Sequence, residues 1–135
     1  MTKETKTREL EERLIEFAVR AIRVAGALPD TKIGNHIAAQ MIRSCTSPAP
    51  NYGEAQDAES RSDFIHKVKI ILKELRETKV WLVMIGKAKL IRPVSKLEPL
   101  IAECDELISI FVKSVQTARE NRKPARAACR PGNPS

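Results

Sequence analysis

The chain has 135 residues, of which 42% are hydrophobic and 30% are charged. This balance is typical of one soluble globular domain and excludes a disordered chain. Aromatic residues make up only 4% and glycines number five, so we expect a helical protein with an aliphatic core rather than a turn-rich β fold. The formal net charge of +7 favours an acidic partner such as nucleic acid or an anionic surface.

Much of the positive charge lies near the C-terminal end. Residues 118–135 contain five basic residues and one acid, a net charge of +4 out of the total of +7. The three cysteines, Cys45, Cys104 and Cys129, are widely separated and form no CxxC pair, which favours a reducing cytoplasm over a disulfide framework. The first residues are polar, so we expect no signal peptide. No apolar run approaches the length of about 18 residues that a membrane span requires.

A first helix is predicted over residues 8–27. Apolar side chains recur at steps of three and four residues, which indicates one buried face. The sequence Leu28–Asp30 ends this helix, and Asp30 or Thr31 can cap the next one. The apolar positions are Leu10, Leu14, Phe17, Ala21, Val24 and Leu28.

A second helix is predicted over residues 32–45. Its apolar face consists of Ile33, Ile37, Met41 and Cys45. Pro48 and Pro50 follow closely, and two prolines cannot both lie deep in an uninterrupted helix without lost hydrogen bonds or a bend. We therefore expect a kink or a short break, with the helix resuming near residue 51.

A third helix is predicted over residues 63–87, with Ser60 or Ser62 as its N-cap. A fourth helix begins near Leu97, where Ser95 and Glu98 have the spacing of a capping box. The apolar seam of the third helix is Phe64, Val68, Ile71, Leu75, Thr78, Leu82 and Ile85, and that of the fourth is Leu97, Ile101, Cys104, Ile108, Phe111, Val115 and Ala118.

Four amphipathic segments with short connections predict an all-α fold, an antiparallel up-down-up-down four-helix bundle. The bundle should span residues 8–120. Residues 1–7 are expected to be a flexible N-terminus, and residues 121–135, which are rich in proline and arginine, a disordered basic tail.

A second face of the predicted third helix carries Glu74, Glu77 and Trp81 beside apolar residues. Buried carboxylates cost several kcal/mol unless they are paired, so this face suits a bundle core poorly. We expect it to form a subunit interface, where a neighbouring copy supplies Lys or Arg. The alternative is a solvated face with Trp81 half-covered.

Two polar residues follow the expected break. Asn51 and Glu54 lie one helical turn apart, and we expect them to hold the backbone freed by the prolines or to reach Lys67. A catalytic role would need a nucleophile or an acid–base partner, and none is evident. Neither His36 nor His66 follows a glutamate by three residues, so a di-iron carboxylate site is not expected. No catalytic residue, metal or cofactor is predicted.

Basic residues form a stripe on the third helix. His66, Lys69, Lys73 and Arg76 are spaced by three and four residues, and Arg20 with Arg23 form a smaller cluster on the first helix. Together with Arg119, Arg122 and Lys123 near the C-terminal end, they can follow a phosphate backbone, and oligomer symmetry would multiply their field. The alternative is a face that only keeps the protein soluble.

The sequence from Arg43 to Leu82 resembles the signature of four-helix-bundle proteins encoded in intervening sequences of bacterial large-subunit ribosomal RNA genes. The likeness covers most of the chain except both ends. It implies a small cytoplasmic bundle that assembles as a ring-like homo-oligomer, expected to be a pentamer. Relatives in this family accompany the reverse transcriptases of diversity-generating retroelements. Among the matching positions are Arg43, Ser44, Asn51, Glu54, Phe64, His66, Lys67, Glu74, Glu77, Thr78 and Trp81.

Three functions follow from these observations. The leading one is a non-enzymatic homo-oligomer that binds RNA or DNA without sequence preference, as an accessory to a nucleic-acid enzyme such as a reverse transcriptase. The second is a structural or protein-binding module with no nucleic-acid binding. The third, an enzyme with a site at subunit junctions, lacks any of the usual catalytic motifs.

Overall fold

The computed structural model describes the backbone of residues 2–129 and the side chains of residues 2–121. Within residues 2–129 the chain forms five α-helices and one short 3-10 helix, which confirms the all-helical class. The elements are α1 (Lys3–Ala27), α2 (Lys32–Cys45), α3 (Pro48–Gln56), α4 (Arg61–Lys87), η1 (Val94–Leu97) and α5 (Glu98–Cys129).

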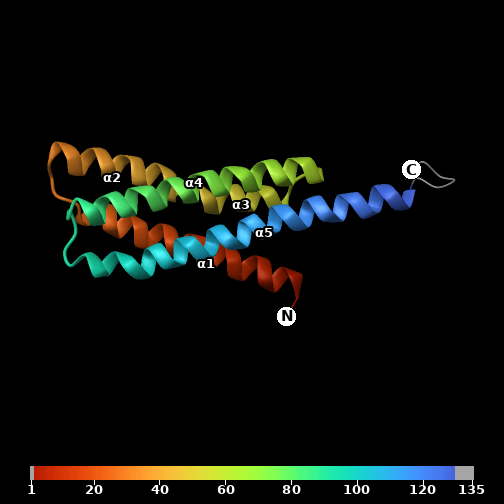
Figure 1. The fold of residues 1–135 in the computed structure, drawn as a ribbon, viewed down its shortest axis with the longest axis horizontal. Coiled ribbons are helices and arrows are strands. Elements are labelled where there is room, and N and C mark those ends of the chain that lie inside the picture. The colour runs from red at the N-terminus through yellow and green to blue at the C-terminus, as the bar shows by residue number, and fades with distance from the viewer. Residues whose placement is uncertain (1, 130–135) are drawn as a thin grey trace.

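The helices lie side by side along one long axis (Figure 1). The chain runs along the molecule in α1, returns through α2 and α3, runs out again in α4 and returns in α5. Because α2 and α3 follow one another along the same side, five helices fill four positions. Both α1 and α4 pack against α2, α3 and α5, so α1 and α4 occupy opposite corners of the bundle.

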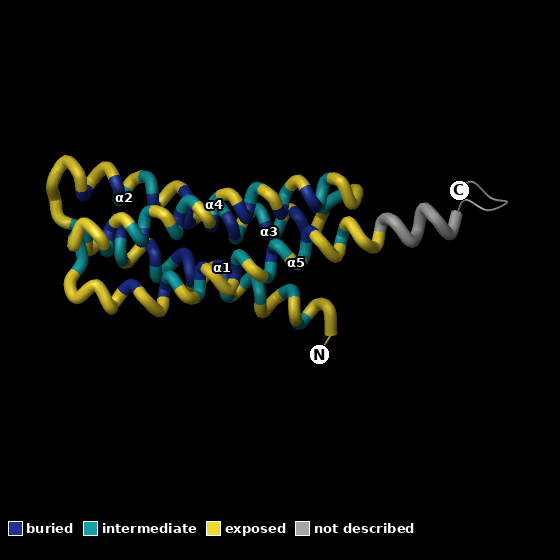
Figure 2. Tube along the Cα trace, in the orientation of Figure 1, coloured by how far each residue is buried: buried dark blue, intermediate teal, exposed yellow. Residues whose placement is uncertain are grey.

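The core follows the apolar seams closely on α4. Figure 2 shows the buried positions along the inward sides of the helices. Every predicted seam residue of α4 is buried except Phe64, which is half-buried. On α5 the buried face is rotated relative to the prediction, because Leu100 and Leu107 are buried whereas Ile101 and Ile108 are half-buried. The prediction that Ile33 lies on the buried face of its helix is wrong, since its exposed fraction is 62%.

The first helix begins five residues earlier than predicted. Thr2 caps it, and its hydroxyl accepts a hydrogen bond from the backbone N–H of Thr5 at 3.1 Å. Residues 3–7 carry no apolar seam, so periodicity gave no signal there. Tertiary packing supplies the reason, because Thr7 lies beside the buried Tyr52 of α3.

The breaks between helices lie close to their predicted positions. Helix α2 ends at Cys45, Thr46 and Ser47 form a turn with right-handed helical dihedral angles, and α3 begins at Pro48, three residues before the predicted Asn51. Proline suits the first turn because that turn needs no hydrogen bond from its nitrogen. Thr31 caps α2 and Ser60 caps α4, each by accepting a backbone N–H at 3.0 Å.

The start and end of α5 differ from the prediction. Ser95 lies inside η1 rather than at a helix N-cap, and the N–H of Glu98 is bonded to the Ser95 carbonyl, so the expected capping box is wrong. The α5 backbone continues to Cys129, beyond the predicted end near residue 121. Residues 130–135 of the predicted tail lie outside the described residues. No helix in the described part is long and apolar enough to cross a membrane.

Candidate nucleic-acid interface and the adjoining helix contacts

The acidic face of α4 is covered by α2 of the same chain. The Arg43 guanidinium lies 3.4 Å from the Glu74 carboxylate and is also paired with Glu77. The Trp81 ring N–H donates a hydrogen bond to the same Glu77 carboxylate at 3.1 Å. These contacts join the last turn of α2 to the middle of α4.

A buried hydroxyl pair lies next to this ion-pair cluster. The hydroxyls of Ser44 and Thr78 are 2.7 Å apart, and Thr78 donates to the Glu74 carbonyl at 2.9 Å. His36 contributes an edge-to-face contact with Trp81, with ring centroids 6.4 Å apart. Arg43, Ser44 and Thr78 are among the positions that match the family signature, so these signature residues join α2 to α4.

The prediction that Glu74 and Glu77 need a cation from a neighbouring subunit is therefore wrong in its premise. Their side chains are only 13% and 28% exposed, yet Arg43 neutralises both from within the chain. Sequence reasoning treated each helix face separately and missed Arg43 as the partner. A paired arginine removes most of the cost of placing carboxylates between helices.

The polar residues near the break act between and within helices. The Asn51 amide donates to both the carbonyl and the hydroxyl of Ser47, at 3.0 and 2.9 Å. It thus satisfies backbone and side-chain oxygens next to Pro48. The Glu54 carboxylate is 2.6 Å from the Lys67 ammonium group, which ties α3 to α4 and raises the pKa of Lys67.

The basic stripe of α4 lies on its outer face. His66, Lys69, Lys73 and Arg76 are all exposed. The ion pairs found among residues 2–121 include none of these four side chains. The two glutamates of the same helix pair with Arg43 of α2, although Glu77 lies one turn after Lys73 and is its neighbour on the helix surface. The outer face thus carries a line of exposed basic residues that lie outside the ion pairs of residues 2–121.

The remaining predicted basic residues lie elsewhere. Arg20 and Arg23 are on α1, at the opposite corner of the bundle from α4, so they form a separate cluster. Arg119 is exposed on α5. The side chains of Arg122 and Lys123 lie outside the described residues. Of the predicted nucleic-acid residues, the structure brings together the four on α4.

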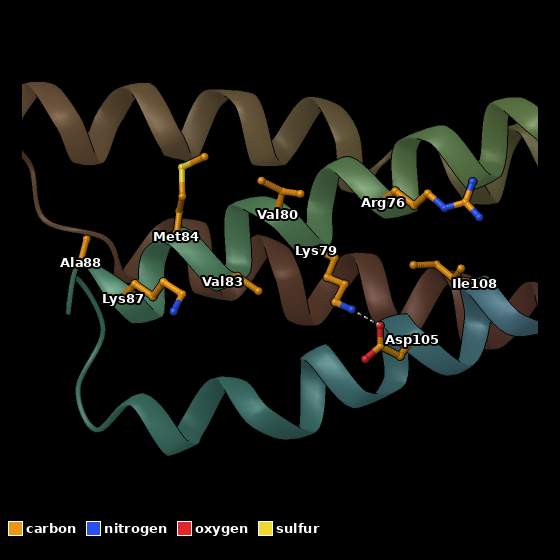
Figure 3. Close-up of a pocket in the computed structure, with 9 residues that line it drawn as sticks. All are labelled: Arg76, Lys79, Val80, Val83, Met84, Lys87, Ala88, Asp105 and Ile108. Carbon is orange, nitrogen blue, oxygen red and sulfur yellow. Dashed lines mark ion pairs between the residues drawn. The ribbon is translucent and has the colours of Figure 1, made fainter.

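An apolar groove lies between α4 and α5, and Arg76 of the basic stripe is one of the residues that line it (Figure 3). We call it the α4/α5 groove. The groove has a volume of about 770 Å³. Lys79 of α4 and Asp105 of α5, which both line it, form an ion pair at 2.6 Å. The lining residues are Arg76, Lys79, Val80, Val83, Met84, Lys87, Ala88, Asp105 and Ile108. Sequence reasoning missed this groove, because its two sides come from different helices.

The cysteine thiols of the bundle are poorly suited to nucleophilic chemistry. Burial raises the pKa of Cys45 to about 11 and that of Cys104 to about 12. Both groups therefore stay protonated at neutral pH, whereas the thiolate is the reactive form. Within the described residues, no group of three or more His, Cys, Asp or Glu side chains is placed to hold a metal ion.

The fold and site define a class: a helical bundle with an internal polar contact between α2 and α4 and a basic outer face. The family model of the 23S rRNA-intervening sequence protein matches residues 7–113, and the chain belongs to this family. It is similar in structure to a protein with unknown function from the S23 ribosomal protein family of Bacteroides thetaiotaomicron, with a TM-score of 0.74 and 30% sequence identity. That match covers 82% of this chain and 98% of the other. A comparison with curated proteins finds no match.

Proposed function

We propose that this protein is a non-enzymatic homo-oligomer that binds RNA or DNA without sequence preference through the basic stripe of α4. The observation that carries the proposal is the difference in pairing between the acidic and the basic side chains of that helix. Glu74 and Glu77 are turned inward to Arg43, whereas Lys69, Lys73 and Arg76 face outward. Phosphate groups are the natural partners of such a line of exposed cations.

The stripe has a suitable length for a short stretch of backbone. From His66 to Arg76 the helix rises about 15 Å, at about 1.5 Å per residue. The stripe contains no Phe, Tyr or Trp, and His66 is its one aromatic ring, so we expect phosphate contacts rather than stacking on unpaired bases to supply most of the affinity. The binding is therefore expected to be general for polyanionic strands and strongly weakened by salt.

Self-association would strengthen the binding of phosphate groups, because it brings several basic stripes together. The resemblance implies an antiparallel bundle in a ring-like assembly, expected to be a pentamer, in the cytoplasm. In such a ring each copy contributes one basic stripe, and a modest patch becomes a continuous positive field. A protein of this kind suits an accessory role beside a nucleic-acid enzyme such as a reverse transcriptase.

The test is a titration of fluorescently labelled single-stranded RNA and of duplex DNA over a salt series, followed by anisotropy. We expect the logarithm of the binding constant to fall linearly with the logarithm of salt concentration. The variant Lys69→Gln/Lys73→Gln should weaken binding at every salt concentration. On single strands each lost phosphate contact should reduce the slope by about 0.7.

A matched control removes the same charge elsewhere. Lys32→Gln/Lys96→Gln changes two exposed lysines of α2 and η1, outside the stripe. It should bind nearly as tightly as the wild type. Equal losses in both variants would assign the binding to net charge alone, and no binding at low salt would remove the nucleic-acid function.

The second candidate is a structural or protein-binding module. The α4/α5 groove favours it, because Val80 and Met84 in that groove are 52% and 45% exposed. Exposed apolar surface of this kind is typical of contacts with other protein surfaces. Absence of nucleic-acid binding together with a stable oligomer would select this function.

A further inference from the structure

Exposed apolar side chains gather on two opposite sides of the bundle. Seven large hydrophobic residues are exposed among those whose side chains are described. Six of them belong to either the α1/α2 side or the α4/α5 side, and only Ile33 lies apart from both. The six are Ile15, Ile22 and Ile42 on the first side, and Val80, Met84 and Val94 on the second.

The second side is the α4/α5 groove and its margin. Val80, Val83, Met84 and Ile108 supply apolar surface within it, as Figure 3 shows. Val94 lies at the margin, in a smaller pocket that shares Val83 and Lys87 with the groove. Three cations, Arg76, Lys79 and Lys87, line the groove against one acid, Asp105, which Lys79 already neutralises. The groove is therefore apolar inside and positive at its edges.

The first side presents an apolar stripe on α1. Ile15, Val19 and Ile22 follow one another at steps of four and three residues, so they share one face of the helix. Ile15 and Ile22 are 42% and 41% exposed, and Val19 is half-buried. Glu12 and Glu16, both exposed, lie within one turn of this stripe, and the exposed Arg23 follows it.

A residue of α2 extends this stripe. The Cys45 sulfur lies 3.9 Å from the Ala18 carbonyl, which fixes the register of the two helices. Ile22 is one turn after Ala18 and Ile42 is about one turn before Cys45. Because α1 and α2 run in opposite directions (Figure 1), Ile22 and Ile42 lie at the same level. We call Ile15, Val19, Ile22 and Ile42 the α1/α2 patch.

We propose that the α1/α2 patch of one copy docks into the α4/α5 groove of the next copy. This inference rests on the self-association in the proposed function and names the surfaces that would produce it. Apolar surface meets apolar surface, and Glu12 and Glu16 beside the patch complement Arg76 and Lys87 beside the groove. The proposed contact does not use the face that carries Glu74, Glu77 and Trp81, since Arg43 of α2 already pairs with both carboxylates.

The position of the two surfaces determines the kind of assembly. They lie on opposite sides of the bundle, because α1 and α4 occupy opposite corners. A contact between two different surfaces repeats from copy to copy and yields a ring when the rotation closes. His66, Lys69 and Lys73 are not among the residues that line the groove, so this contact leaves most of the basic stripe accessible.

The test uses two full-length variants, each with one surface changed. Ile22→Glu places a charge in the patch, and Val80→Glu places one in the groove. We expect light scattering to give an oligomer for the wild type and a mass near 15.1 kDa for each variant alone. A 1:1 mixture retains one intact patch and one intact groove, so it should form a heterodimer of twice that mass.

Ile33→Glu is the matched control, since it introduces the same charge at an exposed isoleucine outside both surfaces. It should keep the wild-type mass, and circular dichroism should show all variants folded. The inference is overturned if either single variant keeps the wild-type oligomer, or if the mixture stays monomeric. A monomeric wild type would overturn the self-association itself, whereas the salt titration of the Lys69 and Lys73 variant tests nucleic-acid binding independently.

Discussion

The side of α4 that faces α2 and the outer face of α4 both carry charged residues. The charges on the first side are paired within the chain, whereas those on the outer face are exposed to solvent. Facing α2, the carboxylates of Glu74 and Glu77 meet Arg43, and the Thr78 hydroxyl meets Ser44. On the outer face, Lys69, Lys73 and Arg76 are exposed and lie outside the ion pairs of residues 2–121. The first side is thus part of the folded bundle. The second is left for a partner, and the variants below separate the two roles.

The largest difference in stability is expected between a buried and an exposed apolar residue of α4. Leu75→Ala removes a fully buried side chain from the centre of the core and should lower the free energy of unfolding by about 2–5 kcal/mol. Val80→Ala removes a side chain that is 52% exposed and should change it by less than about 0.5 kcal/mol. Urea unfolding of both variants, at a concentration where each is monomeric, measures this contrast.

The next effect concerns the internal cation. Arg43→Met leaves Glu74 and Glu77 between the helices without their partner, so we expect a loss of about 1–2 kcal/mol, limited because Arg43 is half-exposed. Lys73→Met removes one exposed charge of the outer face and serves as control, with a change within about 0.5 kcal/mol. Equal stability of the two variants would contradict the internal role of Arg43.

Alkaline pH should also lower the stability of the bundle through the buried Cys104 thiol. Burial raises the pKa of Cys104 from its ordinary 9.0 to about 12, so above pH 9 the unfolded state loses the thiol proton whereas the folded state keeps it. The unfolded state then binds fewer protons, and stability falls as pH rises. At pH 10 the raised pKa of Cys104 should lower the free energy of unfolding by about 1.4 kcal/mol.

Cys104→Ala isolates this contribution. The variant starts from a lower stability because it leaves a small cavity, but its stability should fall less steeply between pH 8 and pH 10.5 than that of the wild type. Urea midpoints measured across this range give the two slopes. Parallel slopes would show that Cys104 does not carry the pH dependence.

The smallest effect is expected at the hydroxyl pair. Thr78→Val keeps the shape of the side chain but removes its hydrogen bonds to Ser44 and to the Glu74 carbonyl. The expected loss is about 1 kcal/mol. The double variant Ser44→Ala/Thr78→Val should lose less than the sum of the single variants, because both remove the same bond. Additive losses would argue against a coupled pair.

Several features of the fold were predictable because they depend on local spacing. The apolar steps on residues 68–85 fixed the buried face of α4, and the prolines after Cys45 fixed the break between α2 and α3. The basic stripe was also predictable, since residues at steps of three and four must share a helix face. The early start of α1 was missed, because Thr7 and Tyr52 meet only through packing.

By itself the sequence determined an all-helical chain, the approximate bounds of its helices and the grouping of residues on each helix face. Only the tertiary structure decided which faces meet. It paired Glu74 and Glu77 with Arg43, rotated α5 so that Leu100 and Leu107 are buried, and left two apolar surfaces on opposite sides. The physical reason is that periodicity fixes directions around one helix axis, whereas partners depend on the rotation and register of one helix against another.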